Sequence, residues 1–192
     1  VISKSSTDYG KPYLLWQTKS FLIVFERESS WYLFDWLIFD IAFSNDGFTY
    51  ITGDLSFDIS THNYRGFVHK LDSEGNGVWS NLVGQNGWTT PYAIDVDSNG
   101  DVYLAGDTNE HLNGEINNGG YDGFITKLDS GGTEIWTTLI GTDSAEWISG
   151  IELNKNGNLY AVGSTGGNLN GQTNKGSYDG FLLEIDPKLK KQ

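Results

Sequence analysis

The chain of 192 residues contains no cysteine, which excludes disulfide bonds, zinc–thiolate sites and thiol catalysis. It has only three prolines and no methionine, so no initiator residue is present, and we expect a processed chain or a part of a longer protein. Its most apolar run, residues 21–25, is far shorter than the roughly 20 residues that a membrane-spanning helix needs. We therefore predict no membrane insertion.

Positive charge is scarce as well, with 12 Lys and Arg against 25 Asp and Glu and a net charge of -13. Nucleic acids and anionic membrane surfaces would repel such a chain, so we expect neither as a partner. The chain does contain 25 glycines and 14% aromatic residues, a composition typical of β-sheet proteins.

One four-residue motif occurs three times, with Tyr at its first position and Gly-Phe at its end. The copies are Tyr64-Arg65-Gly66-Phe67, Tyr121-Asp122-Gly123-Phe124 and Tyr178-Asp179-Gly180-Phe181. Successive motif glycines lie 57 residues apart. A repeat of this period indicates stacked supersecondary units rather than a single unrepeated core.

Each repeat predicts four short strands. The first two flank an Asp-Gly or Asn-Gly dipeptide at residues 46–47, 99–100 and 156–157, a strong hairpin signal because such a turn needs positive φ angles. The third strand begins at the Gly-Phe pair, and the fourth carries a tryptophan. Four short antiparallel strands per repeat are typical of a β-propeller blade.

These motifs resemble the SBBP-type β-propeller repeat of bacterial proteins. The shared pattern runs from the Tyr-Asp-Gly-Phe motif at 121–124 through Lys127-Leu128-Asp129, Gly132 and Trp136 to the hairpin at 156–163. The resemblance implies a propeller fold. It hardly constrains function, because propellers serve binding, scaffolding and catalysis alike.

The resemblance covers residues 36–186 and a short strand around Trp16, and it fails over residues 19–35. The first copy also departs from the pattern, since Arg65 replaces the motif Asp and the connection before Gly66 is four residues shorter. The stretch at 19–35 is rich in aromatic residues and contains no glycine. We consider a two-stranded excursion or an aromatic docking segment, a packed insertion, and a corrupted stretch of sequence.

We therefore predict an all-β fold, a β-propeller built from 57-residue, four-stranded antiparallel blades with three blades per chain. The expected divisions are a flexible N-terminus (1–11), a closing outer strand (12–18), an atypical aromatic insertion (19–35), three blades (36–83, 84–140 and 141–186) and a basic C-terminal tail (187–192).

The third blade lacks an outer strand of its own, and the strand of that type left over contains Trp16. Three blades do not close a ring, which typically needs about four to eight. We expect two chains to form a six-bladed ring in which each Trp16 strand completes the other chain's last blade. The alternative is that the chain is a piece of a longer propeller.

The connections between predicted strands are minimal at one end of the blades and long at the other. Long loops on a rigid scaffold are where binding concentrates. At the long-loop end, two tryptophans lie at non-equivalent positions and the sequence Leu-Asn-Gly occurs twice. The candidate ligand-binding residues are Trp88, Trp147, Asn113, Asn170 and Glu146.

Other recurring residues predict structural roles. Gly66, Gly123 and Gly180 each precede Phe at the start of a strand, which predicts a close backbone approach or a positive φ angle. Asp122 and Asp179 are expected to accept backbone hydrogen bonds. Trp16, Trp79 and Trp136 recur at one strand position and predict packing between blades.

We find no pattern for catalysis, a metal or a cofactor. His62, His69 and His111 occupy no equivalent positions. Residues 97–101 have the opening spacing of a calcium loop, but Thr108 stands where the loop needs Glu, so a hairpin turn explains them better. Asp95 and Glu152 are the only central carboxylates that an enzyme could pair.

The sequence favours a non-catalytic interaction or scaffold module that binds a partner through its long-loop face. A glycan-binding propeller is the alternative, because planar rings stack on sugars while Asn side chains bond to hydroxyl groups. A fragment of a larger propeller enzyme is a second alternative. Composition and repeat type favour an extracellular or periplasmic location in a bacterium.

Overall fold

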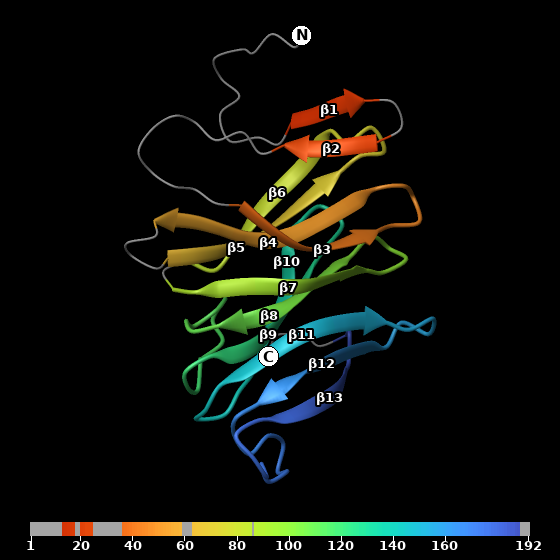
Figure 1. Cartoon of the computed structure of the whole chain (residues 1–192). Helices are drawn as coiled ribbons and strands as arrows, with labels where there is room; N and C mark the ends of the chain where they lie inside the picture. The colour runs from red at the N-terminus through yellow and green to blue at the C-terminus, as the bar shows by residue number, and fades with distance from the viewer. Residues whose placement is uncertain (1–12, 18–19, 25–35, 59–62, 86, 189–192) are drawn as a thin grey trace.

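The computed structural model describes residues 13–17, 20–24, 36–58, 63–85 and 87–188, and within these ranges every regular element is a β-strand (Figure 1). Three antiparallel sheets follow one another in sequence order, preceded by a separate two-stranded sheet. The predicted all-β fold with four-stranded antiparallel sheets is confirmed. The expected flexible N-terminus at 1–11 lies outside the described residues, as does most of the predicted insertion.

The first blade consists of β3 (Trp36–Phe43), β4 (Thr49–Asp58), β5 (Asn63–Leu71) and β6 (Gly77–Val83), paired in that order. Its middle strands have 10 and 9 residues, against 7 in both middle strands of the next blade. The shorter connection expected before Gly66 is therefore mostly strand.

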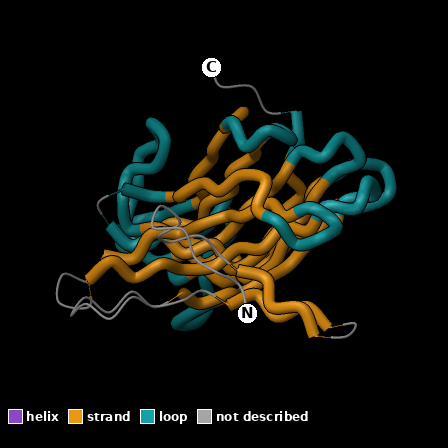
Figure 2. Tube along the Cα trace, turned by 90° about the horizontal axis from the view of Figure 1, so that it is seen from above, coloured by secondary structure: helices purple, strands orange, loops and turns teal. Residues whose placement is uncertain are grey.

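The second blade consists of β7 (Thr89–Val96), β8 (Val102–Thr108), β9 (Asp122–Leu128) and β10 (Glu134–Ile140). The third contains β11 (Glu146–Leu153), β12 (Leu159–Thr165) and β13 (Asp179–Ile185). The first strand of the second blade, β7, contacts both β3 and β11, and the three blades follow one another along the molecule (Figure 1). Figure 2 shows the same body of strands from above, with the loops at the strand ends.

β1 (Tyr13–Gln17) and β2 (Ser20–Val24) form a hairpin in which Trp16 lies opposite Phe21. We expected the strand around Trp16 at the outer edge of a third blade. Within one chain it pairs with β2 instead, and no described strand pairs with the second edge of β13. The exchange of this strand between two chains stays a prediction.

A β-bulge interrupts the first strand of every blade at the same position. The bulged residues are Phe39, Tyr92 and Ser149. The residue before each bulge pairs with a glycine of the second strand, namely Gly53, Gly106 or Gly163. A Cβ atom on any of these glycines would lie within 2.0 Å of a carbonyl oxygen on the bulged strand. Only glycine fits there, which explains why these positions recur in the sequence.

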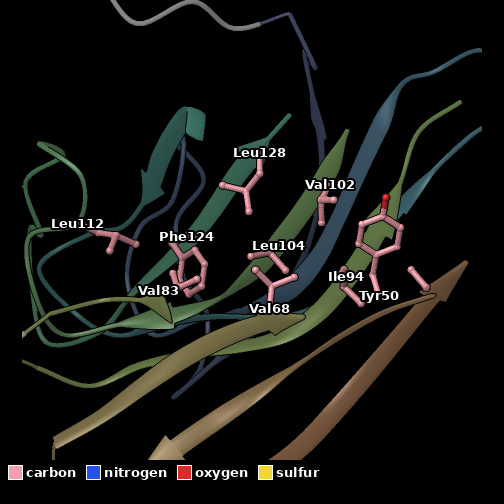
Figure 3. Close-up of a cluster of buried hydrophobic side chains, with 10 residues drawn as sticks. Tyr50, Val68, Val83, Ile94, Val102, Leu104, Leu112, Phe124 and Leu128 are labelled. Atoms are coloured by element: carbon pink, nitrogen blue, oxygen red, sulfur yellow. The ribbon is translucent and has the colours of Figure 1, made fainter. Parts of the chain in front are cut away.

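The middle blade is buried on both faces because neighbouring residues of one strand point into different cores. Along β8, Val102 and Leu104 belong to a hydrophobic cluster shared with the first blade (Figure 3), whereas Tyr103 and Ala105 belong to one shared with the third. All seven residues of β8 are buried. This explains why the strand does not alternate between apolar and polar residues.

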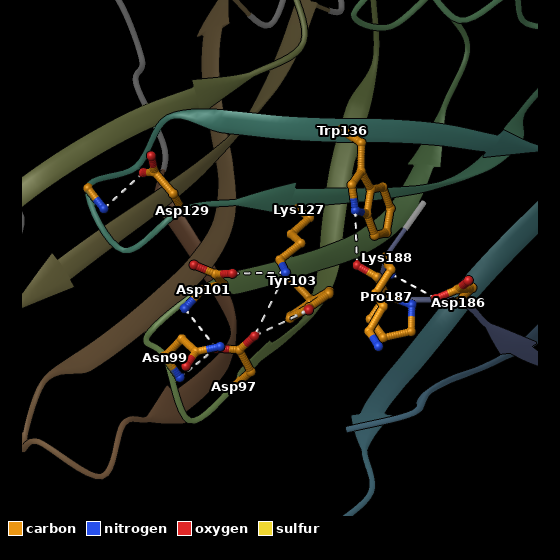
Figure 4. A network of polar contacts seen from close by, with 11 residues as sticks. Asp97, Asn99, Asp101, Tyr103, Lys127, Asp129, Trp136, Asp186, Pro187 and Lys188 are labelled. Carbon is orange, nitrogen blue, oxygen red and sulfur yellow. Dashed lines mark hydrogen bonds and ion pairs between the residues drawn. The ribbon is translucent and has the colours of Figure 1, made fainter. Parts of the chain in front are cut away.

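The turns at the short-loop end share a side-chain cap. An oxygen of Asp72, Asp97, Asp129 or Asn154 accepts hydrogen bonds from the backbone N–H groups two and four residues later. Lys127 Nζ lies 2.8 Å from Asp101 and 3.8 Å from Asp97 (Figure 4). The stretch with calcium-loop spacing is thus a capped hairpin turn paired with a lysine of the same chain.

Tryptophans on the outer strands tie each blade to the next. Trp79 Nε1 donates a hydrogen bond to the Ser130 carbonyl at 3.1 Å, and Trp136 Nε1 donates one to the Pro187 carbonyl at 3.4 Å (Figure 4). Ser130 and Pro187 occupy the same position in successive repeats. The outer-strand tryptophan therefore connects blades through a hydrogen bond as well as through its ring.

The motif glycines give the next blade room to approach. A Cβ atom on Gly66 would lie 2.4 Å from Pro91 Cδ, and one on Gly123 would lie 2.9 Å from Ile148 Cγ1. Neither glycine has a positive φ angle. Of the two predicted reasons for a glycine at these positions, the close approach of the next blade is therefore the one that applies. Gly180 is exposed, and its Cβ atom would meet nothing closer than 3.8 Å.

The first and third blades each leave an apolar face uncovered. On β3 the exposed side chains are Leu37, Ile38, Phe39, Ile41 and Phe43, and on the third blade they include Val162 and Leu182. The described residues form no helix long and apolar enough to cross a bilayer.

Candidate binding face

The connections at one end of the blades bond to one another. The N–H of Gly120 donates to the Ser144 carbonyl at 3.1 Å, and the N–H of Gly166 donates to the Ala145 carbonyl at 2.8 Å. Trp88 and Asn109 are joined in the same way at 3.0 Å. These loops form one continuous surface, which we name the long-loop face.

The first group of rings on this face gathers around Trp88. Its ring centroid lies 4.1 Å from that of Tyr64 and 6.4 Å from that of Tyr121, the latter edge-on. Its Nε1 donates to Thr90 Oγ1 at 2.8 Å, and its backbone N–H donates to Asn109 Oδ1 at 2.7 Å. Trp88 therefore joins the first two blades, with its ring only partly accessible.

The second group consists of Trp147 and Tyr178, whose ring centroids lie 5.0 Å apart. We expected Trp147 in the preceding loop, but it is the second residue of β11 and pairs with Ser164. The strand fixes it, and it is half-buried. Tyr178 is 57% exposed and offers the more accessible ring of the pair.

The tyrosines of both groups are the first residues of the three repeated motifs. The motif was read from the sequence for its glycine, and its tyrosine was not proposed as a binding residue. Its recurrence at the beginning of the third strand of each repeat, at the long-loop face, was the available signal.

Glu146, a predicted ligand-binding residue, is completely buried. Its carboxylate accepts hydrogen bonds from the Thr142 N–H at 2.6 Å, the Thr142 hydroxyl at 2.9 Å and the Thr165 hydroxyl at 2.7 Å. Glu146 therefore stabilises the loop that leads into β11. Because it is buried, it is not accessible to a ligand at the long-loop face.

The repeated Leu-Asn-Gly sequence forms a tight turn. Asn113 and Asn170 have positive φ angles of 53° and 49°, and the glycine after each does too. Asn113 Nδ2 donates to Thr137 Oγ1 of the outer strand at 2.9 Å. Asn170 is exposed, beside an edge of β13 with which no described strand pairs. The positive φ angle is therefore the feature that the two asparagines share in this structure.

Asp122 and Asp179 brace the loops that approach the third strands. Asp122 Oδ2 accepts the Asn118 N–H at 2.9 Å, and Asp179 Oδ2 accepts the Lys175 N–H at 2.9 Å. Burial raises the pKa of Asp122. Both carboxylates therefore hold the geometry of the face.

A buried pair of carboxyl groups below Trp88 was missed in the sequence. Asp54 and Asp107 are 5% and 2% exposed, and each follows the strand glycine opposite a bulge. Thr90 Oγ1 donates to Asp54 Oδ2 at 3.1 Å. Within the described part of the chain, Oδ1 of each carboxyl group has no hydrogen-bond partner.

Burial raises the pKa of Asp54 to about 7, and the hydrogen bond from Thr90 offsets this only in part. Burial also raises the pKa of Asp107 to about 7, with a lowering contribution from Tyr92 and a raising one from the charge of Asp54. The Gly-Asp dipeptide at the same position of two repeats was the available signal for this pair.

The other titratable candidates have structural surroundings. His69 is buried against Ser80, and burial lowers its pKa to about 4. His111 is exposed and accepts the Asn117 N–H at 3.0 Å, while His62 lies outside the described residues. No group of metal-ligating side chains occurs in the described part of the chain.

The two central carboxylates, Asp95 and Glu152, have different surroundings. Asp95 accepts the Val96 N–H at 2.7 Å and the Leu153 N–H of the next blade at 2.6 Å. Glu152 is exposed. Asp95 is therefore a connector between β7 and β11.

Comparison with known families identifies the class of the repeat. Residues 78–113 match the family described as beta-propeller repeat (SBBP). Over these residues the resemblance to the SBBP-type repeat seen in the sequence is confirmed. The matched stretch runs from β6 across the junction into the first two strands of the second blade. No curated protein matches the chain.

Proposed function

We propose that this chain is a non-catalytic binding module of a β-propeller that holds a partner at its long-loop face. The observation that carries the proposal is the set of rings gathered there from all three repeats. Tyrosine and tryptophan supply large contact areas at low entropic cost, and they dominate binding surfaces. The strands beneath hold the rings in place.

The chemistry of the face favours a protein segment as the partner. A chain with a net charge of -13 attracts basic or neutral segments and repels acidic ones. Tyr178, with its ring against Trp147, is the most accessible anchor of the face described here. Composition supports placing the module outside the cytoplasm of a bacterium, at the cell surface or in the periplasm.

A phage-displayed peptide library selected on the folded chain tests this proposal. The selected peptides should lose at least tenfold in affinity for Tyr178→Ala and Trp147→Ala. They should bind normally to Lys155→Ala, an exposed position in a turn at the opposite end. Peptides that are insensitive to the two ring variants and sensitive to Lys155→Ala would place binding on the short-loop end and overturn the proposal.

Glycan binding is the second candidate, and the Trp147–Tyr178 pair is the observation that favours it. A half-buried ring beside an exposed one can present a flat apolar surface to a sugar, with polar loop residues nearby. A glycan array on the unmodified chain and on Trp147→Ala, with circular dichroism as the folding control, separates the two candidates. A glycan signal that Trp147→Ala removes supports the lectin function.

A further inference from the structure

We propose that the uncovered face of the third blade receives the uncovered face of the first blade of a second copy, so that two chains close a six-bladed ring. This inference concerns the blade faces and does not depend on what the long-loop face binds. It rests on an interface that the chain already contains twice.

The first argument is the fit between the motif glycine and the next blade. Gly123 leaves room for Ile148, as Gly66 does for Pro91. The third pair in this series is Gly180 and Ile38, the residue of β3 that occupies the position of Ile148 in the register against β4. Gly180 is exposed and Ile38 is 47% exposed. Both residues of a third contact of this kind are therefore present and uncovered.

The face of β3 is suited to burial. Five of its apolar side chains are exposed, with Phe43 reaching 69%, although one of them, Phe39, has its ring centroid 5.4 Å from that of Tyr92 in the second blade. Its one charged residue, Asp40, is already bonded to the N–H groups of Ile41 and Ile94 at 2.8 and 3.0 Å. Monomeric proteins rarely leave such a contiguous apolar surface in water. On the β3 side, such a contact would therefore bury no carboxylate that lacks hydrogen-bond donors.

The second argument is the groove beside β13, about 510 Å³ in volume. Leu169 and Asn170 line it on one side, and Phe181, Leu182 and Leu183 of β13 line it on the other. In the second blade β10 pairs with the corresponding strand β9, and Asn113 bonds to it. The groove therefore lies where an outer strand belongs, and an extended strand is the occupant that fits it.

The occupant is β1 of the second copy, because the repeat predicts what the strand must carry. Aligning Trp16 with Trp79 and Trp136 places Gln17 at the position of Thr137, opposite Asn170. The hydrogen bond from the outer-strand tryptophan is accepted by a backbone carbonyl of the next blade, that of Ser130 for Trp79 and that of Pro187 for Trp136. The residue at the same position of the first blade is Ser73.

Pairing with β2 does not prevent this exchange. β1 uses one edge for β2 and keeps the other, so the hairpin can add to β13 as a unit. β2 then becomes a fifth strand outside the blade. The stretch that interrupts the repeat pattern after Trp16 is where β2 lies, which gives that irregularity a structural meaning.

Light scattering on the unmodified chain is the primary test. We expect a mass of twice 21.3 kDa at micromolar concentrations. A mass of one chain overturns the proposal, which is the result if the residues are instead a piece of a longer propeller. A mass of three or more chains overturns it as well, because the ring would not close with two copies.

Matched variants locate the contact. Gly180→Val and Ile38→Asp should each shift the mass to one chain. The controls are Gly176→Val, an exposed glycine without a positive φ angle, and Ile116→Asp, an isoleucine 68% exposed on a loop. Both controls should keep the mass of two chains. If both interface variants keep it too, the faces do not meet. Trp16→Ala should weaken association at least tenfold, and unchanged association would exclude β1 as the occupant.

Because the chain contains no cysteine, the contact can be tested directly by disulfide cross-linking between introduced cysteines. Ile38→Cys and Gly180→Cys chains are mixed and oxidised, and a disulfide-linked pair is expected in the mixture and in neither variant alone. Circular dichroism of each variant checks that it folds. Linked pairs of Gly180→Cys alone would show that third blades meet each other, and no linkage in the mixture would show that the two faces stay apart. Either result overturns the ring.

Discussion

The second and third blades share one sequence pattern and differ in what surrounds them. In β9 every residue except Lys127 is buried, whereas β13 alternates between half-buried and exposed positions. The motif glycine, the phenylalanine after it and the strand length are the same in both. The repeat therefore specifies a blade that has neighbours on both sides, and burial in each copy depends on whether those neighbours are present.

The two blades also satisfy one polar position with opposite chemistry. In the second blade Lys127 pairs with Asp101, and in the third blade Glu184 at the same position accepts hydrogen bonds from Asn158 Nδ2 at 2.6 Å and Tyr160 at 3.2 Å. The contact between neighbouring strands is kept while the donor and acceptor change places, and the ion pair becomes a hydrogen bond from a neutral amide to a carboxylate. The geometry of the blade, more than the identity of its side chains, is what the copies share.

Truncation of the motif phenylalanine should give the largest difference in stability loss between the second and third blades. Phe124 is completely buried, so Phe124→Ala should cost about 3–5 kcal/mol in the free energy of unfolding through lost contacts and a cavity. Phe181 is only half-buried, and Phe181→Ala should cost about 1–2 kcal/mol. Urea denaturation of dilute, single-chain samples measures both. Equal losses would mean that the third blade is covered after all.

A side chain at the motif glycine is the next comparison. Gly123→Val forces Ile148 to move and should cost about 1–3 kcal/mol, as overpacking usually does. Gly180→Val meets open space in a single chain and should change stability by less than about 0.5 kcal/mol. The urea midpoints at concentrations below association decide this. An unchanged midpoint for Gly123→Val would show that the approach of the third blade is not tight.

The buried carboxyl groups predict a pH dependence that belongs to the first two blades, since the third has Ser164 at this position. The pKa of Asp54 rises from 3.8 to about 7 on folding. Between these values the folded chain binds more protons than the unfolded chain, so stability decreases as pH rises from about 4 to about 7.

At about 1.4 kcal/mol per pKa unit, the shift of Asp54 corresponds to a loss on the order of 4 kcal/mol, and Asp107, which is coupled to Asp54, adds to it. Asp54→Asn should remove most of this slope, while Asp143→Asn at an exposed position should preserve it. Thermal melts across this pH range measure the slope. A slope that survives in Asp54→Asn would assign the dependence to other groups.

The smallest expected difference concerns the two asparagines of the tight turns. Both have positive φ angles, so replacement by alanine adds similar backbone strain to each. Asn113→Ala additionally loses the bond to Thr137 and should cost about 0.5–1.5 kcal/mol more than Asn170→Ala in a single chain. If association restores an outer strand beside Asn170, the difference should shrink in concentrated samples, which a concentration series of melts detects.

The blade pattern was predictable because each strand boundary has a local cause. The Asn-Gly and Asp-Gly turns need positive φ angles, and Gly47, Gly100 and Gly157 have them. The bulges were not predictable, because a skipped residue such as Tyr92 depends on how the neighbouring strand is registered. The pairing of β1 with β2 was missed for the same reason, since strand partners are a non-local choice.

The gathering of the long connections at one end was predicted by topology more successfully than the surroundings of single residues were predicted by residue type. Loop length correctly indicated which connections gather at one end, as the bonds between Gly120 and Ser144 show. Residue type misplaced Glu146, because a carboxylate in a loop-like stretch gives no indication that three hydrogen bonds will bury it. Asp54 and Asp107 were missed because burial between blades appears only after the blades are assembled.

The alternation of β8 between two cores has a consequence for how the chain opens. Because Leu104 and Tyr103 belong to different clusters, melting this strand removes the support of both outer blades at once. The three blades therefore behave as a row of units, each coupled to its nearest neighbour. The first and third blades should open locally more readily than the middle blade. Amide hydrogens should accordingly exchange slowest in β8 and β9, and fastest in β13.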